Sequence, residues 1–236
     1  MKQYQGEKAI ISLTSWKARI KTVGLTIYSL LTQCPGFHIV LVLSEEEFPR
    51  KEEELPLDLL LLSIANRIEI LWVYKNYKAF KKVLFTIDKY REVPVISADD
   101  DCIYLYNYAE AFYREWRRHR NCFITCYLQT WHFMNAPHLG GAATLYPPYV
   151  FGDFAIKCLN DTEIYNYTKQ DDDFYTALRE VLGLRLAIKI ADYHKLYFFH
   201  DEIEPSHNEI RRLNTSRHDL SKTILNIVRA YYNGTF

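Results

Sequence analysis

Apolar and polar residues alternate along the first hundred positions in blocks that predict strands and helices in turn. The runs at 38–43 and 93–98 are mostly apolar, as expected for strands buried on both faces of a sheet. Between such runs, apolar residues recur at helical spacing, for example at Val83, Leu84 and Ile87. The predicted strands cover residues 8–13, 38–43, 68–73 and 93–98, and the predicted helices cover residues 20–33, 55–65 and 79–90.

Strand–helix–strand units with short connections predict a mostly parallel central sheet flanked by helices, so we expect an α/β fold. The chain has 236 residues, and no repeat and no Pro/Gly/Ser-rich linker divides it. We therefore expect one domain that covers residues 1–236.

The second half of the chain has a weaker pattern. The segment 140–148 contains two glycines and two prolines and is expected to be irregular. A helix is predicted at 171–183, because acidic residues suit the N-terminal turn of a helix. Short strands are predicted at 186–190 and 196–199, and part of 209–232 is predicted to be helical.

The charge of the chain is balanced, with 29 Lys and Arg against 29 Asp and Glu. No global field attracts nucleic acid, so we expect no nucleic-acid partner. The N-terminus lacks a signal-peptide pattern, and the longest aliphatic stretch is too short to span a bilayer. The five cysteines form no CxxC pair. These features together predict a cytoplasmic protein with reduced thiols.

Polar residues follow two of the predicted strands. Thr14, Ser15 and Arg19 follow the first strand, and Asp99–Asp101 follow the fourth. Open α/β sheets bind their ligands beyond the carboxyl ends of the strands. We therefore expect both clusters to contribute to one site.

Three consecutive carboxylates after a buried strand repel one another unless a cation lies close to them. Asp oxygens together with substrate phosphate oxygens are the usual ligands of Mg²⁺ or Mn²⁺. Asp99 and Asp101 are the candidate metal ligands, and the metal would stabilise a departing diphosphate. A solvated acidic turn is the alternative interpretation, and the position after a buried strand favours the metal.

Several cations could contact the same phosphates. Lys78, Lys81 and Lys82 begin the helix that precedes the acidic triplet, and Arg19 follows the first strand. The alternative is that these residues form a solvated helix face and a surface arginine.

A second acidic triplet, Asp171–Asp173, begins a predicted helix. It could simply cap the helix, or it could supply the general base that deprotonates an acceptor hydroxyl. The histidines show no metal-binding spacing, although His200 or His207 could complete a metal shell. The chain has no Walker loop, GxGxxG or GxSxG motif, which disfavours P-loop ATPases, dehydrogenases and serine hydrolases.

Five motifs occur in the order found in a family of bacterial GT-A-type glycosyltransferases, and the chain resembles that family over roughly residues 8–190. Members of this family are similar to the enzymes that build capsular and lipopolysaccharide sugars. The motifs are IISLTSWKARI, NYKAFKKVLFTIDKY, VISADDDCIY, GGAATLYPP and DDDFYTALREVLG.

The resemblance implies a role for each motif. Asp99–Asp101 look like the DxD motif, in which Asp99 and Asp101 bind the metal and Asp99 and Asp100 bind the donor. The donor-binding residues would also include Thr14, Ser15, Arg19, Lys78 and Lys82. The segment 140–148 resembles a loop that borders the acceptor. Asp172 and Asp173 match the acidic pair in which the catalytic base of an inverting enzyme lies.

The resemblance also implies a single GT-A-like domain with a nucleotide-sugar-binding half at about 8–105 and an acceptor-binding half at about 106–236. The expected reaction moves a hexosyl or N-acetylhexosaminyl group from a UDP-sugar to a hydroxyl of a bacterial surface glycan, with Mn²⁺ or Mg²⁺ as cofactor. A lipid-linked acceptor would allow peripheral contact with the inner face of the plasma membrane.

Two other classes of protein stay open. A nucleotidyltransferase could use a similar sheet, although many of these enzymes have a glycine-rich turn after the first strand and this chain has no glycine there before Gly24. A non-catalytic carbohydrate-binding module would bind sugar without metal, and would leave the position of Asp99–Asp101 unexplained. The sequence does not fix the oligomeric state.

Overall fold

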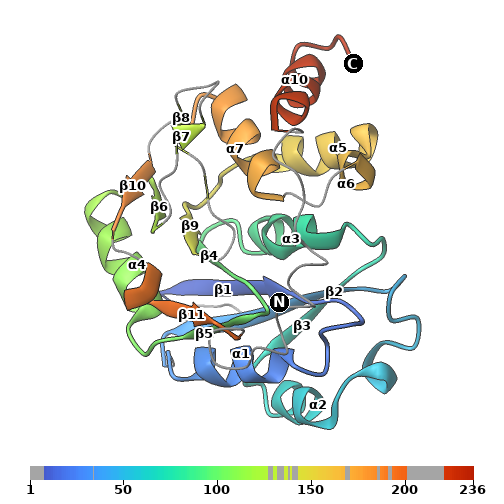
Figure 1. Ribbon diagram of the computed structural model, residues 1–236, viewed down its shortest axis with the longest axis vertical. Coiled ribbons are helices and arrows are strands. Elements are labelled where there is room, and N and C mark those ends of the chain that lie inside the picture. The colour runs from blue at the N-terminus through green and yellow to red at the C-terminus, as the bar shows by residue number, and fades with distance from the viewer. Residues whose placement is uncertain are drawn as a thin grey trace.

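A seven-stranded sheet forms the centre of the molecule (Figure 1). The computed structural model describes residues 8–33, 35–126, 130–131, 136–137, 139, 143–167, 171–184, 187–190, 193–200 and 221–236. The sheet strands are β1 (Ala9–Thr14), β2 (Phe37–Ser44), β3 (Glu69–Val73), β4 (Val95–Ala98), β6 (Phe123–Thr125), β9 (Thr144–Tyr146) and β10 (Ala187–Lys189). Two small antiparallel pairs join β5 (Cys102–Tyr104) to β11 (Tyr197–Phe199), and β7 (Thr130–Trp131) to β8 (Ala136–Pro137).

The strand order is β10-β6-β9-β4-β1-β2-β3. Strand β1 pairs in parallel with both β2 and β4, β2 with β3, and β6 with β10. Strand β9 is antiparallel to both of its neighbours, β4 and β6. The predicted α/β fold with a mostly parallel central sheet is therefore confirmed. The chain moves outward from β1 to β3 and then returns to β4, so the order reverses between β1 and β4.

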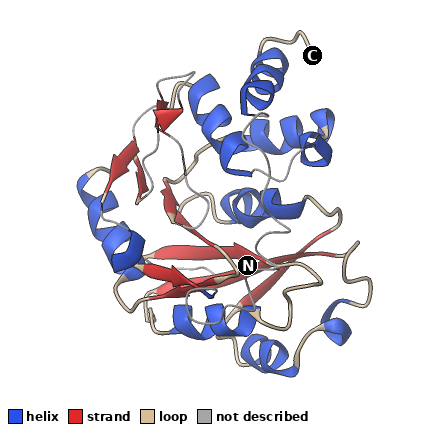
Figure 2. Ribbon diagram, viewed as in Figure 1, coloured by secondary structure: helices blue, strands red, loops and turns tan. Residues whose placement is uncertain are grey.

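Helices cover both faces of the sheet (Figure 2). Successive residues of β1 and β2 point to opposite faces, and both faces are buried because each carries a helical layer. The α-helices are α1 (Val23–Leu31), α2 (Leu57–Ile64), α3 (Lys81–Lys89), α4 (Tyr108–Arg118), α5 (Gly152–Thr162), α6 (Ile164–Tyr167), α7 (Asp171–Val181) and α10 (Ser221–Tyr232). Short 3-10 turns cover Lys51–Glu54, Lys78–Phe80 and Tyr193–Lys195.

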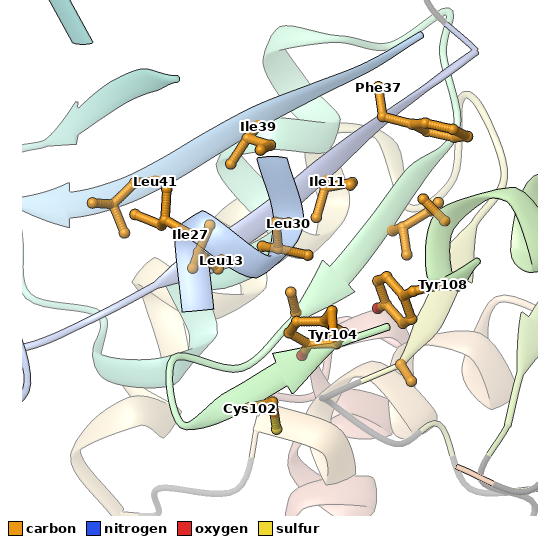
Figure 3. Packing of buried hydrophobic residues seen from close by; sticks show 14 of the residues in the cluster. Ile11, Leu13, Ile27, Leu30, Phe37, Ile39, Leu41, Cys102, Tyr104 and Tyr108 are labelled. Carbon is orange, nitrogen blue, oxygen red and sulfur yellow. The ribbon is translucent and has the colours of Figure 1, made fainter. Parts of the chain in front are cut away.

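One side of the sheet packs against α1, α2 and α4. Figure 3 shows part of this core, in which Ile27 and Leu30 of α1 lie over Ile11 and Leu13 of β1. The aromatic rings of Tyr104 and Tyr108 close the same layer. On the other side, α3 packs against β1, β2 and β4, and α5, α7 and α10 extend the same hydrophobic core farther from these strands.

The first half of the chain follows its sequence pattern closely. The four predicted strands and three predicted helices are all present, with boundaries that move by at most three residues. The helix predicted at 79–90 is split, because a 3-10 turn at Lys78–Phe80 precedes α3. Lys78, the first residue of this turn, has a positive φ of 51°, a conformation that L-residues seldom adopt.

In the second half, the predicted irregular segment at 140–148 is wrong in part, because Tyr146 belongs to strand β9. Residues 140–142 of this segment lie outside the described residues. The helix at 171–183 and the strands near 187 and 197 are present, and α10 occupies the end of the helix predicted at 209–232. Residues 209–220 lie outside the described residues. Helices α4 and α5 were not predicted.

The four cysteines within the described residues (Cys102, Cys122, Cys126 and Cys158) are free and buried, as expected for reduced thiols. In the same part of the chain, no helix combines the length and the apolar character needed to cross a bilayer.

Candidate active site

Strands β1 and β4 lie side by side, and each runs into a polar turn at its carboxyl end. Leu13 lies opposite Ala98 in the register of the pair, so the residues that follow, up to Ser15 and Asp99, emerge at the same edge. The strand order reverses at this point, and open α/β sheets bind their ligands at such a reversal. The two polar clusters of the sequence therefore meet where the topology favours a ligand.

Asp100 is the most buried member of the triplet, and two residues of the β1 turn hold its carboxylate. Ser15 Oγ donates to Asp100 Oδ2 at 2.7 Å, and Arg19 Nη1 lies 2.6 Å from Asp100 Oδ1. Arg19 Nη2 lies 3.1 Å from Oδ2 of Asp101. Burial by itself would lower the pKa of Arg19, but the charges of Asp100 and Asp101 outweigh it, and the pKa is raised. A fixed cation therefore ties the β1 turn to the triplet.

The backbone of the triplet is held from behind by α1 and by the segment after β11. Thr26 Oγ1 lies 3.1 Å from the Asp100 carbonyl oxygen and 2.7 Å from that of Cys102. The backbone amide of His200 donates to the Asp101 carbonyl oxygen at 2.8 Å, and its Nε2 lies 3.2 Å from Thr26 Oγ1. His200 thus lies next to the triplet with its imidazole in contact with Thr26, and a role for it in a metal shell stays a prediction. His207 lies outside the described residues.

Asp99 is the most exposed carboxylate of the triplet, with 29% of its side chain accessible. Lys82 Nζ lies 2.5 Å from Asp99 Oδ1 and 3.1 Å from Asp171 Oδ2, so this lysine bridges the two acidic triplets. Burial would lower the pKa of Lys82, but Asp171 and Asp99 outweigh it and hold the pKa well above its ordinary value. Lys82 is a permanently charged centre of the site.

The second triplet divides its side chains among three environments at the start of α7. Asp171 is buried against Lys82, and burial raises its pKa although Lys82 opposes the shift. Asp173 is buried and accepts a hydrogen bond from Ser221 Oγ of α10 at 2.5 Å. Asp172 is only partly buried, and its charge acts on Lys82. Of the two predicted base residues, Asp173 joins helices and Asp172 stays at the site.

Two of the predicted donor-binding residues direct their polar side-chain atoms elsewhere. Thr14 Oγ1 donates to the Val42 carbonyl oxygen of β2 at 2.7 Å. Lys78 Nζ donates to the Tyr165 carbonyl oxygen at 2.7 Å. The residues that the structure does bring together are Ser15, Arg19, Lys82, Asp99, Asp100 and Asp101.

Tyr146, at the end of β9, carries a buried hydroxyl that sequence reasoning missed. The residue is fully buried, and among the described residues its hydroxyl has no hydrogen-bond partner. Burial raises the pKa of Tyr146, and the charges of Asp172 and Asp171 raise it further, more than Lys82 lowers it. The hydroxyl is therefore close enough to the second triplet to experience its field.

Asp171 and Thr26 also belong to the site without having been assigned to it. Thr26 gives a signal in the sequence, because it is a polar residue on the face of α1 that Val23, Ile27 and Leu30 make apolar. For Asp171 no local signal exists. Only the packing of α7 beside α3 selects it, rather than Asp172 or Asp173, as the residue that reaches Lys82.

The donor set fits a metal that binds together with a phosphate ligand. Four carboxylates (Asp99, Asp100, Asp101 and Asp171) meet two cations (Arg19 and Lys82), which leaves a formal excess of two negative charges when all are ionised. No group of three or more His, Cys, Asp or Glu in the described ranges forms a ready-made metal cage. Mg²⁺ commonly takes one or two protein carboxylates and fills its shell with water and substrate phosphate. Asp99 and Asp101, the two more exposed members of the first triplet, suit that mode.

Comparison with known proteins identifies the fold. PcManGT, a mannosyltransferase from Pyrobaculum calidifontis solved in complex with GDP-Man and Mn²⁺, matches 98% of this chain and 73% of its own, with a TM-score of 0.53 and 12% identity. This chain has the fold of that mannosyltransferase. The structure of TarS residues 1–349 from S. aureus matches 94% of this chain and 71% of its own, with a TM-score of 0.50 and 13% identity.

These likenesses concern the fold alone, because the identities are low. No protein-family model matches the sequence, and no curated protein matches it. What the site does must therefore be argued from its own residues.

Proposed function

We propose that this protein is a metal-dependent glycosyltransferase that moves a hexosyl or N-acetylhexosaminyl group from a UDP-sugar to a hydroxyl of a bacterial surface glycan. One observation carries the proposal. The Asp99–Asp101 triplet emerges at the reversal of strand order, held by Arg19 and Lys82, in a fold shared with a mannosyltransferase. The donor sugar and the UDP moiety rest on the sequence resemblance.

The metal would be held by Asp99 and Asp101, whose oxygens are the hard ligands that Mn²⁺ and Mg²⁺ prefer. When bound, such a metal neutralises a diphosphate and makes it a better leaving group. Asp100 is held by Ser15 and Arg19, so its role is to fix the turn in place. The buried cation of Arg19 offsets the mutual repulsion of the neighbouring carboxylates.

Lys82 and Arg19 give the site its positive charge. Both are at least nine-tenths buried, and a buried cation interacts with phosphate oxygens more strongly than a solvated one. We propose that Lys82 contacts the diphosphate and that Ser15 and Arg19 contact the nucleotide. Thr14 and Lys78 stay predictions from the sequence, since their side-chain polar atoms are bonded within the chain.

We propose Asp172 as the general base of an inverting transfer. Asp172 is the partly exposed member of the second triplet, whereas Asp173 is buried and accepts a hydrogen bond from Ser221, and Asp171 is buried against Lys82. The acceptor hydroxyl would lose its proton to the Asp172 carboxylate as its oxygen bonds to the anomeric carbon. The bond between that carbon and the diphosphate oxygen breaks, and UDP leaves with the electron pair.

A second nucleotide-sugar is a candidate donor. PcManGT was solved with GDP-Man and Mn²⁺, so a GDP-sugar is the second candidate donor in the same mechanism. We also propose that the protein acts in the cytoplasm, and that an acceptor carried on a lipid would bring it to the inner face of the plasma membrane.

Thermal unfolding with UDP, GDP or CMP, each with and without Mn²⁺, tests the proposal. A ligand that binds only the native state raises the unfolding midpoint by mass action. We expect UDP to raise it only when Mn²⁺ is present, and Asp101→Asn to abolish the shift. A shift with GDP instead would change the donor and keep the mechanism. No shift with any nucleotide would contradict the transferase and favour a carbohydrate-binding module. Release of pyrophosphate from a nucleoside triphosphate in the presence of a sugar phosphate would indicate a nucleotidyltransferase.

A further inference from the structure

The backbone of Asp99 is held by the hydroxyl group of a buried tyrosine. Asp99 is the first residue after β4, and its backbone amide donates to the hydroxyl oxygen of Tyr104 at 2.7 Å. Tyr104 is the last residue of β5, the strand that follows the acidic triplet. The end of β5 therefore supports the start of the acidic turn (residues 99–101), from which the Asp99 carboxylate emerges.

The side chain of Tyr104 is fixed from several sides. It is buried, and its ring packs against that of Tyr108 with the centroids 4.3 Å apart (Figure 3). The ring of Tyr197 on β11 lies 5.5 Å away, and the backbone amide of Tyr104 donates to Ser29 Oγ of α1 at 2.9 Å. A ring packed in this way has little room to follow a moving backbone, so its hydroxyl is a fixed point for the Asp99 amide.

A second side chain of β5 contacts the other candidate metal ligand. Cys102 Sγ lies 3.7 Å from Asp101 Oδ1, within the range of a weak hydrogen bond from a thiol. Cys102 and Tyr104 are two residues apart on a strand and so point to the same face. One face of β5 therefore contacts both Asp99 and Asp101.

The position of the Asp99 backbone decides where its carboxylate points. That side chain is 29% accessible, and it is one of the two candidate metal ligands. A small divalent metal such as Mg²⁺ requires nearly ideal octahedral geometry, so a displaced ligand weakens its binding. Groups that orient a metal ligand without touching the metal commonly change metal affinity by about 10- to 100-fold.

We propose that Tyr104 is a positioning residue for the metal site. Its hydroxyl holds the Asp99 backbone so that the carboxylate keeps the direction that a metal requires, and Tyr104 itself contacts neither metal nor nucleotide. The proposal rests on the metal-dependent transferase proposed above. An ordinary hydrogen bond of the core would contribute to stability alone, and metal binding separates the two roles.

Tyr104→Phe removes the hydroxyl and keeps the ring. Calorimetric titration of UDP at a series of Mn²⁺ concentrations measures how much metal each protein needs for nucleotide binding. We expect Tyr104→Phe to need about 10-fold more Mn²⁺ than the wild type. At saturating Mn²⁺ its affinity for UDP should approach that of the wild type, because the groups proposed to contact the nucleotide are unchanged.

Tyr108→Phe is the matched control. Tyr108 is also buried, and its hydroxyl donates to the Ser97 carbonyl oxygen within β4, not to the acidic turn. Both variants lose one buried hydrogen bond, so both should unfold at a lower temperature. Only Tyr104→Phe should need more Mn²⁺. An equal increase in both variants would show a general loosening of the core and would overturn the proposal.

The two proposals fail in different ways. If a folded Tyr104→Phe needs no more Mn²⁺ than the wild type, the role of Tyr104 is wrong and the transferase stands. If the wild type binds no UDP with Mn²⁺, the transferase is wrong and the role of Tyr104 falls with it. Hydrogen exchange of the wild type needs no variant, since the Asp99 amide should be protected, and an unprotected amide would overturn the proposal.

Discussion

At the scale of single residues, the acidic side chains of the site form ion pairs with two buried cations. Arg19 neutralises Asp100, and Lys82 is shared between Asp99 and Asp171. Removing one partner of a buried ion pair leaves a charge that the interior cannot solvate, which costs more than the pair itself contributes. The ion pairs therefore organise the site before any ligand arrives, and this is why the turn after β4 and the start of α7 can present carboxylates close together.

Tyr146→Phe should leave the protein as stable as the wild type or make it more stable. Its hydroxyl is buried without a partner among the described residues, so the substitution removes a desolvated polar group. Tyr175→Phe is the matched control, because Tyr175 is equally buried but its hydroxyl donates to the Phe80 carbonyl oxygen at 2.8 Å. The control should lose about 1 kcal/mol in urea unfolding. Equal losses in both variants would show that Tyr146 is hydrogen-bonded in solution.

At the scale of elements, the strands and helices of the first half were predictable because their apolar runs have a clear period. The short strand β9 was not, because the two glycines at 140–141 and the two prolines at 147–148 indicated an irregular segment there. Helix α4 was missed although its buried residues, Tyr108, Ala109, Phe112 and Trp116, have helical spacing. Charged residues between them hid that pattern.

The candidate site, like the fold, could be predicted where it depends on local sequence and not where it depends on contacts between distant elements. Asp99–Asp101, Arg19 and Ser15 follow strands directly, so topology alone brings them together. Lys82 was found as one of three lysines between positions 78 and 82. Only the packing of α3 shows that Lys82 bridges the acidic residues, while Lys78 donates to the Tyr165 carbonyl oxygen. Contacts between elements distant in sequence depend on tertiary packing, which no local pattern records.

Two substitutions at the start of α7 should have different effects, one on stability and the other on activity. Ser221→Ala removes the hydrogen bond to the buried Asp173 that joins α10 to α7, and we expect a loss of about 1–3 kcal/mol in urea unfolding. Asp172→Asn should abolish sugar transfer while nucleotide binding persists, and thermal unfolding shows whether this variant is folded. If Asp172→Asn transfers sugar normally, the assignment of Asp172 as the base is wrong.

The edge strand β3 should contribute a stability term that depends on pH. Burial would raise the pKa of Glu69, but hydrogen bonds from His38, Lys89 and Tyr90 outweigh it and lower the pKa from 4.5 to about 2. The carboxylate therefore stabilises the fold above pH 4.5, and this contribution is lost as the pH falls toward 2. It amounts to at most about 3 kcal/mol.

Urea unfolding of wild type and Glu69→Gln at several pH values measures this term. The difference in unfolding free energy should be largest near neutral pH and should shrink as the pH drops below 4.5. A difference that does not change with pH would mean that the hydrogen bonds to Glu69 leave its pKa at the ordinary value.

At the scale of the whole molecule, the fold assembles the ligand site from segments that lie far apart in the sequence. The turns after β1 and β4 meet where the strand order reverses, and Lys82 of α3 joins Asp99 to Asp171 of α7. The site therefore depends on the packing of the second half of the chain against the first.

Calorimetric titration of UDP with and without Mn²⁺ tests the central claim most directly. The account predicts binding that requires Mn²⁺ in the wild type, that is lost in Asp101→Asn, and that is unchanged in Glu92→Gln, an exposed carboxylate on the turn before β4. Thermal unfolding without ligand shows whether each variant is folded. Binding of UDP by Asp101→Asn as tight as that of the wild type, in a folded protein, would contradict a metal centre at Asp99 and Asp101.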